Sequence, residues 1–249
     1  MNRIRQEKIK EYIEQSNVVT IKQLQALLPD VSLMTIHRDL DVLVAEGAVV
    51  KFRGGAKSVR LSGDPEFTVR MHENNSGKQL IAQKALSLIQ PHTSVFLDAS
   101  TTNLALARAL PDINLNIFTT GPSIALELCR LHNPVVTLCC GTINRKNMAL
   151  SGQNTLEMLE KINIDQAFIG VSGCSVDAGF TCGTEGDMLV KRLVIQKART
   201  SVAMCSRDKL NCLMPYTFAK LEDVDYLISD APMPESFAEA ARTAGLKLL

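Results

Sequence analysis

The chain has 249 residues, enough for one large domain or for a small domain followed by a larger one. Hydrophobic residues make up 46% of it and charged residues 21%, as in ordinary globular proteins. No apolar stretch reaches the about 18 residues that cross a bilayer, so we expect no membrane partner. The formal net charge is +1, which by itself says nothing about binding to nucleic acid.

The chain ends and the cysteines indicate the cell compartment. The first residues are charged and follow a helical pattern, unlike a secretory signal. The seven cysteines form no CxxC pair, and their odd number argues against a disulfide framework. Most lie in apolar runs, so we interpret them as reduced, buried thiols rather than as a redox or metal site. We therefore expect a cytoplasmic protein.

Three short helical patterns follow one another in the first 47 residues. The first spans residues 3–15. The second begins after Thr20, where Gln23 three residues on completes a capping box. Ser32 is a natural N-cap for the third, which places Ile36, Leu40 and Leu43 on one buried stripe. Gly47 ends that helix.

A short helix, a tight turn and a second helix form the unit whose second helix enters the major groove of DNA. Arg38 can reach a guanine edge or a phosphate, and its outward neighbours do so on shorter side chains. A winged helix used only for protein contacts is the alternative interpretation. On the third helix we predict DNA contacts from Ser32, Leu33, Met34, Thr35, His37 and Arg38.

The next segment predicts a β-hairpin wing. Residues 48–57 alternate in polarity around a Gly-Gly turn, and Lys51, Arg53 and Lys57 flank that turn. We expect Lys51 and Arg53 to face DNA phosphates. Residues 1–60 contain ten Lys and Arg against seven Asp and Glu, a mild basic bias that agrees with this hypothesis.

These segments resemble the signature of the DeoR family, VSxxTIRRDLxxLxxxGxxxRxHGGA. Residues 31–40 read VSLMTIHRDL, and residues 51–56 read KFRGGA. His37 and Lys51 stand where the family usually has Arg, and Arg53 stands where it usually has His. These departures affect the operator sequence rather than the fold. The resemblance implies a transcriptional regulator with a winged helix-turn-helix over residues 1–57.

A polar stretch, residues 58–75, predicts a linker that is ordered in part, because Phe67, Val69 and Met71 need apolar cover. Beyond it, residues 76–249 alternate between helices and short apolar strands. Strands this apolar are typically buried on both faces, so we predict an α/β domain with a mostly parallel sheet. The predicted strands are 94–97, 115–118, 135–138, 166–171, 201–204 and 226–228, and the predicted helices are 78–89, 103–110, 123–131, 155–161, 185–198 and 234–244.

Small and hydroxyl-bearing residues follow several of these strands, where such sheets bind ligands. Ser100, Thr101 and Thr102 precede a helix, and hydroxyls with free amides at a helix N-terminus bind anions. Taken singly, each loop is better explained as a helix cap. Together they favour a ligand site. The loops after the next three strands add Thr120 and Ser123, then Gly141 and Arg145, then Gly170, Ser172 and Gly173.

The same region resembles the DeoR sensor domain over nearly its whole length. Residues 98–102 resemble its D-x-G-T-T loop, residues 164–170 its D-x-A-F-x-G strand, residues 206–209 its D-x-S-K turn and residues 225–230 its closing strand. The resemblance implies a fold like ribose-5-phosphate isomerase or a CoA-transferase, with a sugar phosphate as the effector. The isomerase's phosphate loop corresponds to residues 100–102. The predicted effector-binding set is completed by Lys78, which matches an isomerase lysine, and by Asp98, Glu185 and Lys209.

The fold likeness raises the alternative of a sugar-phosphate isomerase. That chemistry needs a carboxylate base. The isomerase has an acidic D-G-A-D-E run where this chain reads IGVSG at residues 169–173. Glu185 could act as a base, but it is better explained as a partner of sugar hydroxyls. We therefore predict a regulator and no catalytic residue.

The motifs of cofactor and metal sites are missing from the sequence. It contains neither a GxGxxG nor a Walker loop, so no nucleotide cofactor is predicted. His72 and His92 have no partner at metal-ligand spacing, so no metal is predicted either. The resulting hypothesis is a repressor of a carbohydrate operon that binds operator DNA as a dimer or tetramer and is modulated by a sugar phosphate.

Overall fold

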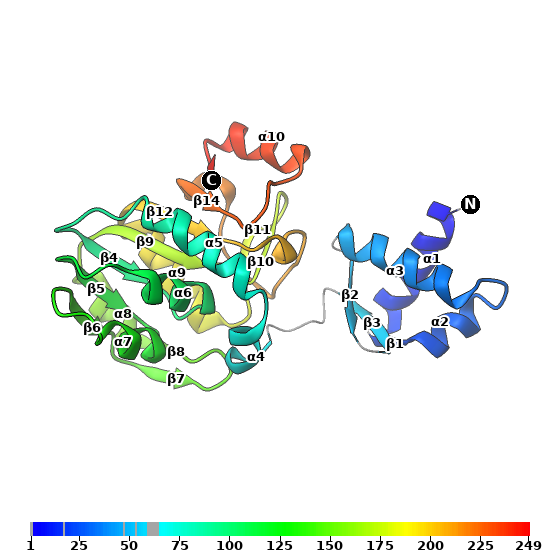
Figure 1. Ribbon diagram of the computed structural model, residues 1–249, viewed down its shortest axis with the longest axis horizontal. Helices are drawn as coiled ribbons and strands as arrows, with labels where there is room; N and C mark the ends of the chain where they lie inside the picture. Colours follow the sequence, from blue (N-terminus) through cyan, green and yellow to red (C-terminus); the bar gives the residue numbers. More distant parts are fainter. Residues whose placement is uncertain (1, 17, 47, 53, 59–64) are drawn as a thin grey trace.

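The computed structural model describes residues 2–16, 18–46, 48–52, 54–58 and 65–249. The first four ranges form a small unit of helices and short strands, and the last range forms a larger α/β unit (Figure 1). Each unit has its own hydrophobic core. Arg53 and Gly47 lie outside the described residues, so the structure does not test the predictions made for them.

The small unit is a winged helix-turn-helix. The predicted caps are confirmed: Gln23 N donates to Thr20 Oγ1 in a full capping box, and Thr35 N donates to Ser32 Oγ. The predicted stripe of Ile36, Leu40 and Leu43 is buried. The elements are α1 (Asn2–Ser16), β1 (Val18–Thr20), α2 (Ile21–Leu27), α3 (Leu33–Ala45), β2 (Val49–Phe52) and β3 (Gly55–Ser58).

The wing is a three-stranded sheet in the order β1-β3-β2, with antiparallel pairs. Strand β1 was not predicted, because three residues between two helices carry no periodicity of their own. Its position explains Gly55, where a Cβ would lie 2.2 Å from Val19 O. A side chain at position 55 would therefore push β1 off the hairpin.

The larger unit is built on a seven-stranded sheet in which every neighbouring pair is parallel, in the order β15-β14-β12-β9-β4-β5-β6. The predicted α/β class is confirmed. The strands are β4 (Ser94–Leu97), β5 (Asn116–Thr119), β6 (Val135–Leu138), β9 (Ile164–Gly170), β12 (Ala198–Met204), β14 (Tyr226–Ile228) and β15 (Lys247–Leu248).

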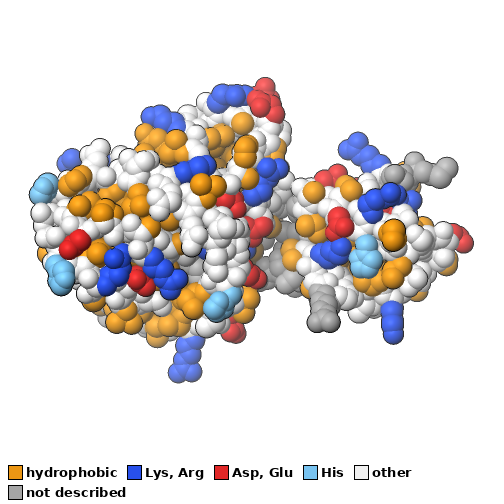
Figure 2. All heavy atoms as spheres, in the orientation of Figure 1, with side chains coloured by type: hydrophobic (Ala, Val, Ile, Leu, Met, Phe, Trp, Pro, Cys, Tyr) orange, Lys and Arg blue, Asp and Glu red, His pale blue; other side chains and the backbone are white. Residues whose placement is uncertain are grey.

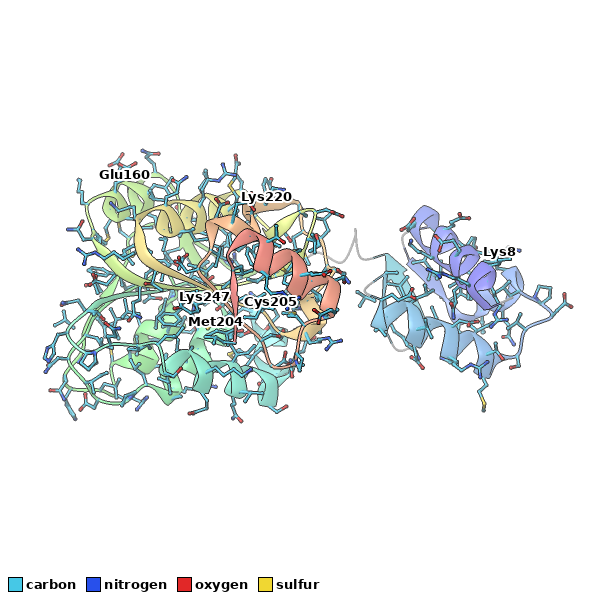
Figure 3. All side chains as sticks on the ribbon, turned by 90° about the horizontal axis from the view of Figure 1, so that it is seen from above. Lys8, Glu160, Met204, Cys205, Lys220 and Lys247 are labelled. Atoms are coloured by element: carbon cyan, nitrogen blue, oxygen red, sulfur yellow. The ribbon has the colours of Figure 1, made fainter. Side chains whose placement is uncertain are left out.

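Helices cover both faces of this sheet, as Figure 3 shows from above. Apolar residues of α5, α6 and α7 pack in one core, and those of α8, α9 and α10 pack in the other. These helices are α5 (Asn75–Leu86), α6 (Thr101–Ala109), α7 (Pro122–Leu128), α8 (Gln153–Glu160), α9 (Glu185–Lys197) and α10 (Glu235–Ala244).

Strand β6 contradicts the expectation that all strands are buried on both faces. It is the last strand of the sheet, and Val135 and Leu138 are 63% and 43% exposed. Apolar composition cannot distinguish a central strand from a terminal one. The expected cover for Val69 is also missing, because its side chain is half exposed on α4 (Phe67–His72), whereas Phe67 is buried. That helix lies inside the predicted linker.

Two small antiparallel sheets were not predicted. One is the hairpin of β7 (Thr142–Asn144) and β8 (Ala149–Ser151), and the other contains β10 (Gly173–Ser175), β11 (Gly179–Cys182) and β13 (Tyr216–Ala219). Strands of three or four residues are too short to show a period, and β13 pairs with a segment far away in the chain. Among the described residues, no helix is both long and apolar enough to cross a bilayer.

Candidate functional site

The order of the strands places one cleft at the centre of the sheet. From β4 the chain proceeds outward through β5 and β6, whereas from β9 it proceeds in the other direction through β12 and β14. The carboxyl ends of β4 and β9 therefore form the crevice where such sheets bind ligands. A cleft lies there, with about 640 Å³ of empty space including its open mouth.

Six parts of the chain form this cleft. They are the loops after β4, β9 and β12, the start of α9, the α4–α5 segment and the β7–β8 turn. Residues predicted from the sequence that line it are Lys78, Asp98, Ser100, Thr101, Thr102, Gly170, Ser172 and Lys209. Lining residues that were not predicted are Arg70, Glu73, Asn74, Ala99, Asn147, Ala149, Val171, Asp187, Lys191, Ser206 and Asp208.

The start of α6 fits both interpretations that the sequence left open, a helix cap and a ligand site. Ser100 is the N-cap, and its Oγ accepts a hydrogen bond from Asn103 N at 3.0 Å. Thr101 and Thr102 are the first residues of the helix and line the cleft. A cap that satisfies one backbone amide thus leaves a helix N-terminus with two further hydroxyls facing the ligand space.

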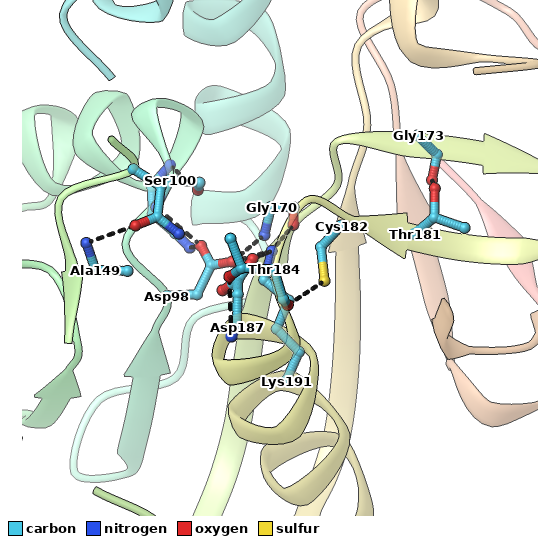
Figure 4. A network of polar contacts seen from close by, with 12 residues as sticks. Asp98, Ser100, Ala149, Gly170, Gly173, Thr181, Cys182, Thr184, Asp187 and Lys191 are labelled. Atoms are coloured by element: carbon cyan, nitrogen blue, oxygen red, sulfur yellow. Dashed lines mark hydrogen bonds and ion pairs between the residues drawn. The ribbon is translucent and has the colours of Figure 1, made fainter. Parts of the chain in front are cut away.

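The carboxylate of Asp98 holds the cleft together (Figure 4). Oδ1 accepts from Asn103 Nδ2 at 2.7 Å and from Ser100 N at 3.1 Å, and Oδ2 accepts from Gly170 N at 2.9 Å. Asp98 is 1% exposed. These bonds join the loop after β4 to the end of β9. The carboxylate of Asp98 therefore positions protein groups and is not a free acceptor for a sugar hydroxyl.

Lys191 completes this network and was missed in the sequence. Its Nζ lies 2.9 Å from Asp187 Oδ2 and 3.3 Å from Asp98 Oδ2, and it donates to Gly170 O at 2.8 Å. Burial opposes its charge, but Asp187 and Asp98 together raise the pKa of Lys191. The i,i+4 spacing from Asp187 on a helix whose other face is apolar was the available signal.

The predicted Lys78 lies in the cleft wall, but its ammonium already has partners. Its Nζ donates to Arg70 O and, at 2.5 Å, to Glu73 O. The side chain is 8% exposed, and burial lowers the pKa of Lys78. Two carbonyls at the end of α4 thus hold the amine that was expected to meet a phosphate.

Other residues predicted for the ligand site lie away from the cleft. Strands β5 and β6 lead away from the crevice. The loop after β5 does not line it, and after β6 it is Asn147 and Ala149 of the β7–β8 hairpin that do. Gly141 packs against Thr155, where a Cβ would lie 2.1 Å from the hydroxyl, and Glu185 is exposed at the start of α9. The full set outside the cleft lining is Thr120, Ser123, Gly141, Arg145, Gly173 and Glu185.

The recognition helix α3 presents the predicted DNA-contacting residues to the surface. Ser32, Leu33, Met34 and Arg38 are exposed, and Thr35 and His37 are partly exposed. Lys51 of the wing is paired with Asp41, with Nζ 2.6 Å from Oδ1. In the view of Figure 2 the small unit carries acidic and basic side chains together. On the face seen there, the charges are mixed and form no broad basic patch.

A buried ion pair fixes the recognition helix to α1. Arg5 Nε lies 2.5 Å from Asp39 Oδ2, and Arg5 Nη2 donates to Asp39 Oδ1 at 3.0 Å. Gln6 Nε2 donates to the same carboxylate at 3.2 Å. Asp39 is 2% exposed, so within the run HRDL the arginine faces outward and the aspartate holds the helix in place.

A winged helix-turn-helix joined to an α/β unit with a ligand cleft defines a ligand-responsive DNA-binding regulator. Comparison with known protein families supports this class for both units of the chain. Residues 5–61 match the DeoR-like helix-turn-helix domain, and residues 73–231 match the DeoR C terminal sensor domain. The chain belongs to the DeoR family of transcriptional regulators, as the sequence motifs predicted.

Several curated relatives are similar over nearly the whole chain. The HTH-type transcriptional regulator GolR of Listeria innocua is 31% identical, covering 97% of this chain and 96% of that protein. The HTH-type transcriptional repressor GlcR of Bacillus subtilis is 31% identical, covering 97% and 93%. The putative aga operon transcriptional repressor of Escherichia coli O157:H7 is 26% identical, covering 98% and 92%.

Solved structures resemble the α/β unit more distantly. Ribose 5-phosphate isomerase A of Methanocaldococcus jannaschii is 16% identical, with a TM-score of 0.41 over 55% of this chain and 55% of that one. The eIF2B beta subunit of Chaetomium thermophilum is 12% identical, with a TM-score of 0.48 over 68% and 54%. At these scores the likeness supports no inference about activity or partners.

Proposed function

We propose that this regulator represses an operon of carbohydrate metabolism, and that a sugar phosphate in the cleft changes its affinity for operator DNA. Residues 1–57 are the DNA-binding unit, residues 58–75 the connection and residues 76–249 the effector-binding unit. The names of two relatives, a transcriptional repressor and a putative aga operon transcriptional repressor, support repression of an operon.

The single observation that carries the proposal is the chemistry of the cleft. The N-terminus of α6, with Thr101 and Thr102, lines it together with the cations Lys78 and Lys209. Helix N-termini and ammonium groups bind phosphate. The polar side chains of Asn147, Glu73 and Asp208 line it as well and offer acceptors for sugar hydroxyls. Such a lining fits a ligand with an anionic end and a polyhydroxyl body.

We infer binding without catalysis from the arrangement of the carboxylates. An isomerase needs a carboxylate that is free to take a proton from a sugar carbon. Asp98 accepts bonds from protein groups at both oxygens, and Asp187 is paired with Lys191 at 2.9 Å. Glu185, the base considered from the sequence, does not line the cleft. The isomerase alternative is therefore the weaker one.

For DNA, we propose two copies of α3 reading half-sites of a palindrome from a dimer or tetramer, with Ser32, Leu33, Met34, Thr35, His37, Arg38, Lys51 and Arg53 at the interface. A two-fold oligomer sets the half-sites about 34 Å apart, one helical turn of DNA. Lys51 must then exchange its partner Asp41 for a phosphate. Affinity that falls steeply with salt is expected; affinity independent of salt would favour a winged helix used for protein contacts.

A thermal-shift screen of the full chain tests the effector. The ligands are pentose and hexose phosphates, each paired with its unphosphorylated sugar as the control. A specific binder raises the melting temperature by mass action, and the free sugar does not. Equal shifts from the two members of a pair, or no shift from any phosphate, would overturn the proposal. Conversion of a sugar phosphate to its isomer during incubation would instead establish the enzyme.

A further inference from the structure

Helix α4 is held at its N-terminal end by the wall of the cleft. Residues 59–66 join the winged unit to this helix, which is the first helix of the larger unit. Phe67 N donates to Lys146 O at 2.8 Å, in the β7–β8 turn where Asn147 and Ala149 line the cleft. The Phe67 ring is 4% exposed and packs in the core of α5 and α6.

Lys78 holds the other end of the helix. The last carbonyls of a helix have no partner within it, and a cation near them is stabilising. The Lys78 ammonium occupies this position and donates hydrogen bonds to Arg70 O and Glu73 O. A helix of six residues is unstable by itself in water, so these outside contacts decide whether α4 keeps its place.

The same ammonium belongs to the cleft. Lys78 lines it beside Thr101 and Lys209, where the proposed phosphate binds. The ammonium is charged in either case, but a phosphate oxygen carries a formal negative charge and a carbonyl oxygen does not, so the Coulomb attraction favours the phosphate. Burial, which lowers the pKa of Lys78, adds to its need for an anionic partner. A phosphate and the end of α4 therefore compete for one amine.

We infer that α4 transmits the effector signal: a phosphate draws Lys78 away from the carbonyls of Arg70 and Glu73, and α4 loses its C-terminal tether. This inference rests on the proposed function and names its regulation. In the chain, α4 follows the winged unit and precedes α5 and the sheet. A change in the position of α4 therefore reaches the DNA-binding unit without a change in the sheet. Arg70, Glu73 and Asn74 also line the cleft, so the ligand contacts the transmitting segment itself.

A matched pair of substitutions on α4 separates transmission from binding. Phe67→Ala removes the buried anchor, and Phe67 does not line the cleft. Val69→Ala, on the same helix but 50% exposed, is the control. For each full-length protein, calorimetry measures the affinity for the sugar phosphate that stabilises the wild type, and fluorescence anisotropy measures the dissociation constant for DNA with and without that ligand.

We expect Phe67→Ala to bind the sugar phosphate while its response is lost. Allosteric ratios of DNA affinity are commonly about 5 to 150, and this ratio should fall to about 1 in Phe67→Ala and stay unchanged in Val69→Ala. Ligand binding with an unchanged ratio in Phe67→Ala would overturn the inference and leave the proposed function standing. Failure of the wild type to bind any sugar phosphate would remove both.

A second measurement uses only the wild type, so it tests the inference even when Phe67→Ala does not fold. Hydrogen exchange is followed in the full chain with and without saturating inorganic phosphate. Loss of the tether predicts faster exchange at the amides of residues 70–73, and protection at the N-terminus of α6, where the anion binds. Protection at α6 with unchanged or slower exchange in α4 would overturn the inference.

Discussion

The ammonium of Lys191 lies 3.3 Å from Asp98 Oδ2 and joins α9 to the loop after β4. Both side chains are buried, at 4% and 1% exposure. With Asp187 as the second carboxylate and Gly170 O as the third acceptor, this lysine fixes the loops after β4 and β9 to one helix. The floor of the cleft is thus built from paired charges, and its rim carries the groups that remain for a ligand.

Replacing this lysine should destabilise the fold. Lys191→Met leaves Asp98 and Asp187 without their buried cation, and removal of one partner of a buried ion pair costs about 3–5 kcal/mol. Urea unfolding of the full chain measures the loss. Lys161→Met, at an exposed position, is the matched control and should change stability by less than about 0.5 kcal/mol. Equal stability of the two variants would refute the structural role of Lys191.

Arg38→Ala should weaken DNA binding and leave effector binding unchanged. Arg38 is exposed on α3, and an arginine at a base edge contributes about 1–3 kcal/mol, a loss of about 5- to 150-fold in affinity. Anisotropy with operator DNA and calorimetry with the effector measure the two properties. Lys8→Ala on α1 removes the same charge as a control. Unchanged DNA affinity in Arg38→Ala would disprove the recognition-helix assignment.

Thr101→Ala combined with Thr102→Ala should weaken the effector and spare the DNA. Each hydroxyl at the start of α6 can donate to a phosphate oxygen, and hydrogen bonds to charged groups contribute about 1.5–3 kcal/mol. The double variant should therefore bind the sugar phosphate at least about tenfold more weakly by calorimetry. Thr243→Ala, exposed on α10, is the control. A full effector response in the double variant would remove this loop from the site.

The acid stability of the α/β unit should depend on Asp165. Its Oδ2 accepts from Ser94 N at 2.9 Å and from Ser94 Oγ at 2.8 Å, and these bonds lower the pKa of Asp165 in the folded chain. A lowered folded pKa means that the contribution is present above the unfolded pKa, about 3.9, and is lost as the pH falls through the folded value.

Asp165→Asn should therefore be less stable than the wild type at pH 7, with a difference that shrinks as the pH approaches 3. Urea unfolding at a series of pH values measures it. Asp177→Asn, an exposed carboxylate without this serine partner, should follow the wild type. A difference that stays constant down to the lowest pH would show that the charge of Asp165 is not responsible.

Local sequence predicted the parts of this protein that depend on near neighbours. The caps at Thr20 and Ser32 and the apolar stripe of α3 arise within one or two helical turns, so the winged unit could be predicted. Strands 94–97, 135–138 and 226–228 were bounded correctly, and polar residues flank the first and the third of them, Thr93 and Asp98, and Asp225 and Ser229. The hydroxyl-bearing residues at the start of α6 could also be predicted from local sequence, because β4 leads through a short loop into this helix.

Only the tertiary structure decided which loops meet. Neighbours in a parallel sheet are set by crossovers, not by any local period, so nothing in the sequence placed β9 beside β4 or sent β6 to the edge. The cleft therefore excludes Gly141 and Arg145 and includes Lys191, whose charge is buried because Asp98, 93 positions earlier, lies 3.3 Å away. The amine of Lys78 was expected to supply a donor to the ligand, and the folded chain also brings it to the carbonyls at the end of α4.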